Sequence, residues 1–336
     1  MIECIFTVDY EIYGNGEGSL RELVLEPAEK LKIIFRKHNA RFVVFVEAAE
    51  LEIIGSERAD QAIGLVERQI REFHGQGFEV GLHLHPQWYN ARRKDARWQL
   101  DYGEYNLCVL LPDRINQIID RSIAYLRKVL GASHYIPLSF RAGNWLMQPT
   151  AAAAESLAGH GIRIDSSVFK GGLQHQHGLD YRRSRRNGYY WPFSGDVNIP
   201  DPKGILLEMP TYTKMVPAWR MLSSKRVGLR QKSAKGHLKR PGRLSRIRDY
   251  LRPCQPMKLD FCRLTAKELA RMIDEEIGKD RKDPGRFRPI VAIGHTKDLV
   301  DLETVESFLS YLRGKGIPVS TFRNVHDRIA RRNELS

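Results

Sequence analysis

Cysteine is scarce in this 336-residue sequence, and no long hydrophobic segment is present. The four cysteines lack the C-x-x-C spacing of a zinc ribbon or a redox pair, and they are too few for a disulfide scaffold. The most apolar window, residues 42–46, is interrupted by Glu47, far short of the roughly 20 residues that cross a bilayer. A signal peptide requires a basic segment before its apolar stretch, and no such segment precedes the first apolar residues here. We therefore expect a reduced, cytoplasmic protein.

Positive charge is concentrated in one stretch. Lys and Arg total 54 against 40 acids, and residues 220–252 hold eight Arg and four Lys against a single acid, Asp249. We interpret this stretch as a basic insertion or mobile arm, suited to phosphate groups or to an anionic surface such as the inner membrane. Aromatic side chains are nearly absent from it, so no specific nucleic acid partner is expected.

Short runs of β-branched and aromatic residues alternate with longer segments of helical period, the pattern of parallel strands joined by crossover helices. This alternation favours an α/β fold with a closed or nearly closed barrel over an open sheet with a separate domain. We thus expect residues 1–336 to form one barrel that carries the insertion. The expected strands are residues 3–8, 41–46, 78–82, 138–140, 162–164, 205–209, 290–293 and 319–322.

Three helices are indicated by their apolar spacing and end signals. After Pro112, apolar residues recur at steps of three and four, and Gly131 is a C-terminal stop. Thr265 and Glu268 have the spacing of a capping box at the start of a second helix. A third helix is expected over residues 302–313.

Two histidines stand at alternate positions in the segment EVGLHLHP, residues 79–86. Alternate residues of a strand point the same way, so His83 and His85 project together from Cα atoms roughly 6.6 Å apart and can reach one metal ion. The first strand ends in Asp9-Tyr10-Glu11, where the two carboxylates share a face in the same manner. In a parallel topology they lie at the same end of the barrel as the histidines. Structural histidines and solvated acids are the alternative.

Three further expected strands end in polar residues. Arg141 and Trp145 follow one, Asp165 a second and His295 a third. The C-terminal ends of the strands carry the active site in parallel α/β barrels, so five polar clusters that arrive there independently indicate a functional site. Unrelated loop residues are the alternative.

In their order along the chain, these segments resemble the motifs of the polysaccharide deacetylases of carbohydrate esterase family 4, which have the NodB homology fold. Tyr10 stands where the family usually has a second aspartate, and Gln87 stands where its second histidine usually falls. His85, in the arrangement H-x-H-P, is similar to a branch linked to surface-polysaccharide (O-antigen) biosynthesis. The matching segments are residues 7–11, 79–86, 140–145, 164–167 and 293–295.

The resemblance implies a distorted barrel of about seven β/α units and one divalent metal ion, most simply Zn²⁺. It also implies which residues act on the substrate. By position, the metal ligands are Glu11, His83 and His85. The catalytic base is Asp9, which Arg141 orients, and the catalytic acid is His295, which Asp165 holds. The substrate-binding residues are Trp145 and Asn144.

The implied activity is metal-dependent hydrolysis of the N-acetyl group of an amino sugar in a polysaccharide, a lipopolysaccharide or a lipid-linked precursor. Two alternatives remain. One is an amidohydrolase-type metal hydrolase, whose barrels also use H-x-H, although there the pair ends the first strand and here it ends the third. The other is a non-catalytic protein that binds carbohydrate or anions on a deacetylase-like barrel.

Overall fold

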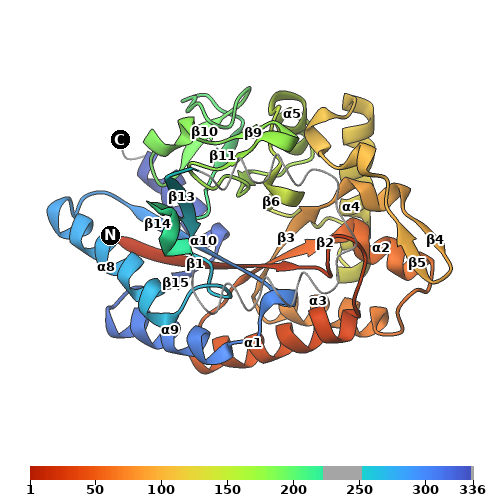
Figure 1. Ribbon diagram of the computed structural model, residues 1–336, viewed down its shortest axis with the longest axis horizontal. Helices are drawn as coiled ribbons and strands as arrows, with labels where there is room; N and C mark the ends of the chain where they lie inside the picture. The colour runs from red at the N-terminus through yellow and green to blue at the C-terminus, as the bar shows by residue number, and fades with distance from the viewer. Residues whose placement is uncertain (222–251, 334–336) are drawn as a thin grey trace.

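The computed structural model describes residues 1–221 and 252–333, which form a curled sheet surrounded by helices (Figure 1). Neighbouring strands run parallel except β10 against β11, and β15 (Val319–Ser320) pairs with β1 beside β2. The eight expected strands are confirmed, each overlapping an observed one. In sheet order the other strands are β10 (Trp191–Phe193), β11 (Leu206–Glu208), β7 (Ile164–Asp165), β6 (Ser139–Ala142), β3 (Glu79–Leu84), β2 (Val43–Glu47), β1 (Ile2–Tyr10) and β14 (Arg288–His295).

Helices connect the strands, and most of them cover the outer face of the sheet, whereas α10 packs against its inner face (Figure 1). α4 ends where Gly131 adopts a left-handed conformation (φ 64°) as the C-cap. Thr265 caps α8 through the expected capping box with Glu268. These two helix predictions are confirmed, as is the one over residues 302–313. The helices are α1 (Glu26–Lys37), α2 (Ala48–Ser56), α3 (Ile63–Gly75), α4 (Pro112–Leu130), α5 (Ala151–Gly159), α8 (Ala266–Lys282), α9 (Leu302–Gly314) and α10 (Phe322–Asn333).

Alternation along β1 divides the core into two layers. Even-numbered residues face the helices, and Phe6 packs edge-on against Phe35 of α1 with ring centroids 5.1 Å apart. Odd-numbered residues face the barrel interior, where Ile5 belongs to a separate apolar cluster that includes Phe322 of α10. Because Asp9 follows on this face, the interior is apolar near α10 and polar toward the C-terminal ends of the strands.

The barrel closes through single bridges rather than through a complete ladder. After β11 the chain reaches Thr211, which pairs with Phe169 on one side and with Val291 of β14 on the other. The amide of Tyr212 donates to the carbonyl of Val291 over 2.9 Å. The edge strands thus meet as the distorted barrel expected from the sequence. Three two-stranded ribbons lie outside the sheet: β4 (Arg92–Lys94) with β5 (Arg97–Gln99), β8 (Leu173–Gln174) with β9 (Leu179–Asp180), and β12 (Thr213–Pro217) with β13 (Cys254–Lys258).

The basic stretch 220–252 joins β12 to β13. Residues 222–251 lie outside the described residues, so its interpretation as an insertion or mobile arm stays a prediction. The structure shows where the stretch leaves and returns, because β12 and β13 pair antiparallel with Pro217 opposite Cys254. Within the described parts of the chain, no helix combines the length and the apolar composition needed to span a membrane.

Candidate active site

The C-terminal ends of β1, β3, β6 and β14 bring together polar residues that are far apart in the sequence. Parallel pairing places Asp9 opposite His295, and His83 opposite Arg141. Side chains alternate along each strand, so these residues share the interior face of the barrel. This convergence is the one that the strand-end pattern indicated.

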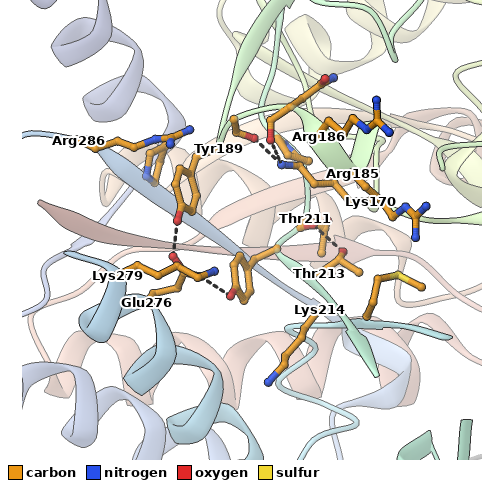
Figure 2. Close-up of a pocket in the computed structure, with 16 residues that line it drawn as sticks. Lys170, Arg185, Arg186, Tyr189, Thr211, Thr213, Lys214, Glu276, Lys279 and Arg286 are labelled. Carbon is orange, nitrogen blue, oxygen red and sulfur yellow. Dashed lines mark hydrogen bonds and ion pairs between the residues drawn. The ribbon is translucent and has the colours of Figure 1, made fainter. Parts of the chain in front are cut away.

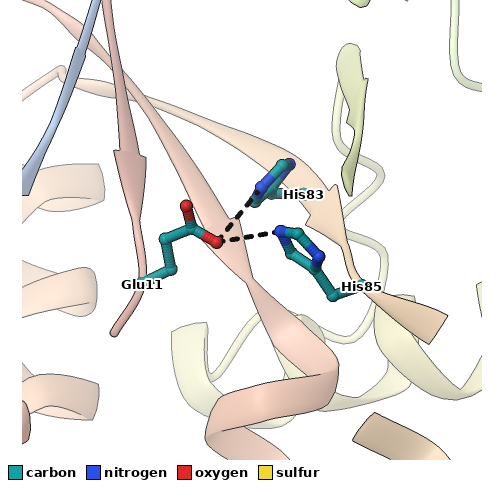
Figure 3. Close-up of side chains that lie close together, drawn as sticks. All are labelled: Glu11, His83 and His85. Atoms are coloured by element: carbon teal, nitrogen blue, oxygen red, sulfur yellow. Dashed lines mark ion pairs between the residues drawn. The ribbon is translucent and has the colours of Figure 1, made fainter. Parts of the chain in front are cut away.

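Glu11 and His85 lie just beyond the ends of β1 and β3 and complete a buried cluster with His83 (Figure 3). The Oε2 atom of Glu11 lies 3.0 Å from Nε2 of His85 and 3.5 Å from Nε2 of His83. Three ligand atoms therefore converge, one from a carboxylate and two from imidazoles.

This donor set fits a divalent metal ion. Ligand atoms held tetrahedrally about 2.0–2.1 Å from a zinc ion are about 3.3 Å from one another, close to the separations between Glu11 and the two rings. Oε2 of Glu11 is buried and accepts no well-directed hydrogen bond from the described residues. The oxygen is thus free to act as a ligand.

The ring of His83 is held in the tautomer that a metal ligand needs. Its Nδ1 lies 2.8 Å from the carbonyl oxygen of Arg141, so Nδ1–H donates and Nε2 keeps a lone pair toward Glu11. Nδ1 of His85 faces the side-chain amides of Asn144 at 3.2 Å and Gln87 at 3.4 Å. The oxygen and nitrogen of an amide are assigned from the hydrogen-bond network, and His85 has the same tautomer when both amides turn their oxygens toward Nδ1.

Lys297 is a residue that the sequence motifs did not indicate. Its Nζ lies 2.6 Å from Oε1 of Glu11 and 3.1 Å from the carbonyl oxygen of Ile12. Burial alone would raise the pKa of Glu11, but the Lys297 ammonium and the two neighbouring imidazoles outweigh it and hold this pKa well below its usual value. Glu11 is therefore ionised, as a metal ligand must be.

Asp9 is held by two partners. Nη1 of Arg141 lies 2.6 Å from Oδ1 of Asp9, and Nε2 of His295 lies 3.4 Å from Oδ2. Arg141 is itself fixed, since it donates to the carbonyl of Ser166 over 3.0 Å and to Oγ1 of Thr7 over 2.9 Å. Burial opposes ionisation, but Arg141 and the nearby imidazoles lower the pKa of Asp9. The expected contact between Arg141 and Asp9 is present.

Asp165 does not hold His295, so that expectation is wrong. Oδ1 of Asp165 accepts from Oγ of Ser167 over 2.5 Å, and the neighbouring carboxyl in the sheet is that of Glu208. Nδ1 of His295 has no hydrogen-bond partner among the described residues. The reason is topological: β7 lies between β6 and β11, whereas β14 pairs with β1.

Asn144 and Trp145 occupy a tight turn after β6, with φ of 54° and 69°. Asn144 contacts the ring of His85, so it lies beside the cluster of Glu11, His83 and His85. The half-buried indole of Trp145 packs against Phe169, with ring centroids 5.4 Å apart, and Nζ of Lys258 lies 4.0 Å from the indole centroid. Burial, together with nearby Arg263, lowers the pKa of Lys258 to about 8.

Two buried acids behind the cluster were also missed. Oε1 of Glu47 accepts the backbone amide of His85 over 2.5 Å, and Oε1 of Glu50 accepts the amide of Ile12 over 2.8 Å. Burial raises the pKa of both, that of Glu50 to about 8. Glu47 ends β2 just as Asp9 lies near the end of β1, so the strand-end rule applied to β2 would have found it.

Comparisons with known proteins show the class of fold. A scan of the sequence against protein-family models finds no match, and neither does a search of curated proteins. The structure is similar to a protein from Mycobacterium smegmatis assigned as a polysaccharide deacetylase, with a TM-score of 0.55, 14% identity and coverage of 99% of this chain and 91% of that chain.

Two other solved structures are similar to different degrees. A GH57-type branching enzyme from Pyrococcus horikoshii aligns with a TM-score of 0.55, 11% identity and coverage of 97% of this chain and 70% of that chain. A CE4 family pseudoenzyme from Bacillus anthracis aligns with a TM-score of 0.44, 9% identity and coverage of 96% and 64%, too distant to carry an argument. The chain thus has a deacetylase-like α/β barrel, a fold that a branching enzyme shares, and the chemistry must be argued from the site.

Proposed function

We propose that this chain is a metal-dependent deacetylase that hydrolyses the N-acetyl group of an amino sugar in a polysaccharide, a lipopolysaccharide or a precursor of either. The observation that carries the proposal is the buried donor set of Glu11, His83 and His85 next to Asp9, whose carboxylate Arg141 holds. One carboxylate and two imidazoles are a known protein ligand set of catalytic zinc, which leaves room for water and substrate. The fold of the Mycobacterium smegmatis protein supports the same activity.

A divalent ion, most simply Zn²⁺, held by Glu11, His83 and His85 would lower the pKa of a water toward about 7 and polarise the acetyl carbonyl. Asp9 accepts the proton of the attacking water, because Arg141 fixes one oxygen and the other faces His295.

His295 delivers that proton to the leaving amine. Its Nε2 lies 3.4 Å from Oδ2 of Asp9, close enough for transfer after a small approach. Burial lowers the pKa of His295, so the ring begins neutral and can take up the proton from Asp9. The proton then passes to the nitrogen as the C–N bond breaks, and the products are acetate and a free amine.

The substrate side of the site is formed by the turn after β6. Part of the Trp145 indole remains exposed and offers a flat apolar surface to a sugar ring. Asn144 lies between this surface and His85, where its amide can bind a polar group of the sugar. A lipid-linked glycan would meet the site at the inner membrane, with residues 220–252 on the anionic surface. This contact and the cytoplasmic location stay predictions from the sequence.

Two conservative variants compared side by side test the proposal. Glu11→Gln should lose stoichiometric zinc, because a neutral amide is a poor zinc ligand. Asp9→Asn should keep its zinc and release acetate about 10²-fold more slowly or worse, because the base is gone. Zinc is measured by elemental analysis, and acetate release is measured on a panel of N-acetylated nucleotide sugars and glycans.

Each other result has a definite meaning. If Asp9→Asn loses zinc and Glu11→Gln retains it, Asp9 is the metal ligand and Glu11 is the catalytic base. Two zinc ions per wild-type chain would favour the amidohydrolase alternative. Zinc binding without acetate release from any substrate of the panel would favour a non-catalytic carbohydrate-binding protein.

A further inference from the structure

A cavity of about 500 Å³ lies at the seam where the edge strands of the barrel meet (Figure 2). It is lined by Lys170, by the segment before β10, by the chain around Thr211, by α8, and by Arg286 and Pro289 at the start of β14. Pro289 and His295 lie on the same strand, six residues and so roughly 20 Å apart. The cavity is therefore distinct from the candidate active site.

The lining is strongly basic. Its one acid, Glu276, is already satisfied, since it accepts hydrogen bonds from the hydroxyls of Tyr189 and Tyr212 and pairs with Nζ of Lys279 over 2.6 Å. The basic residues in the lining are Lys170, Arg185, Arg186, Lys214, Lys279 and Arg286.

Three guanidinium groups of this lining have no acidic partner in the part of the chain that the structure describes. Lys214 pairs with Glu275, outside the cavity. Arg185 donates to the carbonyl of Arg182, and Arg286 stacks on the Tyr189 ring with its guanidinium carbon 5.4 Å from the centroid. Among the described residues, neither these two nor Arg186 forms an ion pair.

Two deeper groups in the lining, Lys170 and Thr211, form no ion pair or hydrogen bond with a carboxylate among the described residues. Nζ of Lys170 donates to the carbonyl oxygens of Asn187 at 2.6 Å and Gly188 at 2.5 Å, which carry no net charge. Burial, and after it the nearby Arg286, lowers the pKa of Lys170 to about 8, against the opposing effect of the Glu208 and Glu276 carboxyls. The hydroxyl of Thr211 is buried and has no hydrogen-bond partner in the described parts of the chain.

We propose that this cavity binds the diphosphate group of an organic ligand. Each guanidinium presents a planar pair of N–H donors that matches two oxygens of a phosphate. A ligand with a single carboxylate would neutralise only a fraction of the positive charge of the lining, whereas a diphosphate can contact several of its cations at once. The volume lies within the range of small-molecule sites and exceeds that of the diphosphate alone, so the cavity has room for a part of the attached group.

Binding of three probes by isothermal titration calorimetry tests the proposal: inorganic pyrophosphate, uridine diphosphate and geranyl diphosphate. The double variant Arg185→Gln/Arg186→Gln should weaken binding of the preferred probe about tenfold or more. Thr211→Val, which changes no charge, should weaken it several-fold. The preferred probe identifies a nucleotide or an isoprenoid source of the diphosphate.

The matched control is Arg182→Gln/Arg183→Gln, which removes the same charge from the same exposed segment but not from the cavity lining. The affinity of this control variant for the preferred probe should stay within about twofold of that of the wild type. Equal losses in the two double variants would show general surface attraction and overturn the proposal. Failure of the wild-type protein to bind any of the three probes at millimolar concentration would overturn it as well. Neither result bears on deacetylation, which is measured separately.

Discussion

In the cluster of Glu11, His83 and His85, metal binding would require that each imidazole turns a ring nitrogen toward Glu11. His83 and His85 both direct Nε2 at the same oxygen of Glu11, so in the proposed metal site each would supply one of three protein ligands. His83→Ala and His85→Ala should each reduce bound zinc from about one equivalent per chain to well below half. Elemental analysis after dialysis against buffer of low zinc content checks this.

His134→Ala is the matched control, because His134 is exposed and lies outside the cluster. Its zinc content should equal that of the wild type. Stoichiometric zinc in both His83→Ala and His85→Ala would contradict the ligand assignment.

Strand-end position was sufficient to find the residues that approach the active site from the interior of the barrel. Asp9, His83 and His295 all lie at such positions, and the structure brings them together. Lys297 was missed because it lies two residues beyond β14, where only the fold of the following turn aims its ammonium at Glu11. A sequence pattern gives no direction to a side chain in such a turn.

At the scale of elements, the turn after β6 requires a glycine. A Cβ atom on Gly143 would lie 2.4 Å from the carbonyl oxygen of Leu84 and 2.8 Å from Nδ1 of His85. Gly143→Ala should therefore displace the His85 ring and weaken zinc binding about tenfold or more, with a lower melting temperature. A competition titration against a chromogenic zinc chelator measures the affinity.

The control for this turn is Gly159→Ala at the end of α5, where an added Cβ meets nothing within 4 Å. It should leave zinc affinity unchanged. If Gly143→Ala binds zinc as tightly as the wild type, the turn does not position His85.

β7 and β11 carry a buried carboxyl pair, Asp165 and Glu208. Burial and the neighbouring Asp165 raise the pKa of Glu208 well above its usual 4.5. A carboxyl with a raised pKa stabilises the fold below its unfolded pKa, and this contribution is lost as the pH rises toward the folded pKa. The side chain of Glu208→Gln cannot ionise, so the variant should not lose this contribution as the pH rises. The free energy of unfolding of the variant minus that of the wild type should therefore increase by more than about 1 kcal/mol from pH 5 to pH 8.

Urea unfolding at pH 5, 6, 7 and 8 measures this difference. Glu155→Gln on the exposed face of α5 should show a difference from the wild type that does not change with pH. A flat difference for Glu208→Gln would show that its carboxyl does not ionise in this range or costs nothing when it does.

The elements found from the sequence are those with a local pattern. α4 has one apolar stripe and a glycine stop, and α8 has its capping box, so both could be placed. α2 is buried on most sides and therefore lacks the polar face that marks a surface helix. β8 and β9 have two residues each, too few to show a period, and they exist because they pair with each other.

At the scale of the whole molecule, alternation of strands and helices was enough to predict a barrel. It could not show how the barrel closes, because Thr211 bridges Phe169 and Val291 as a single residue outside any strand. It also could not show the basic cavity, whose lining comes from five separate parts of the chain. Both features depend on long-range packing rather than on local sequence.

The distribution of charge leads to the last prediction. Residues 220–252 carry most of the net charge, and the ends of this stretch are fixed by the pairing of β12 with β13. Replacing Arg240, Arg243, Arg246 and Arg248 with Gln should weaken binding to vesicles that contain anionic lipid, since each basic residue near such a surface contributes about 1 kcal/mol. Zinc content and turnover at saturating substrate should stay at the wild-type level.

Vesicle co-sedimentation at low and high salt measures the effect, which should be large at low ionic strength and fade above 0.1 M salt, where charges more than about 10 Å apart are screened. The control neutralises an equal number of exposed cations on the ribbon of β4 and β5, namely Arg92, Arg93, Lys94 and Arg97. If the stretch is a membrane-binding element, only its own variant loses binding, because the contact is local. Equal losses of vesicle binding in both variants would show that binding depends on the net charge of the protein and not on this stretch. Unchanged binding in both would show that residues 220–252 have no role at the membrane.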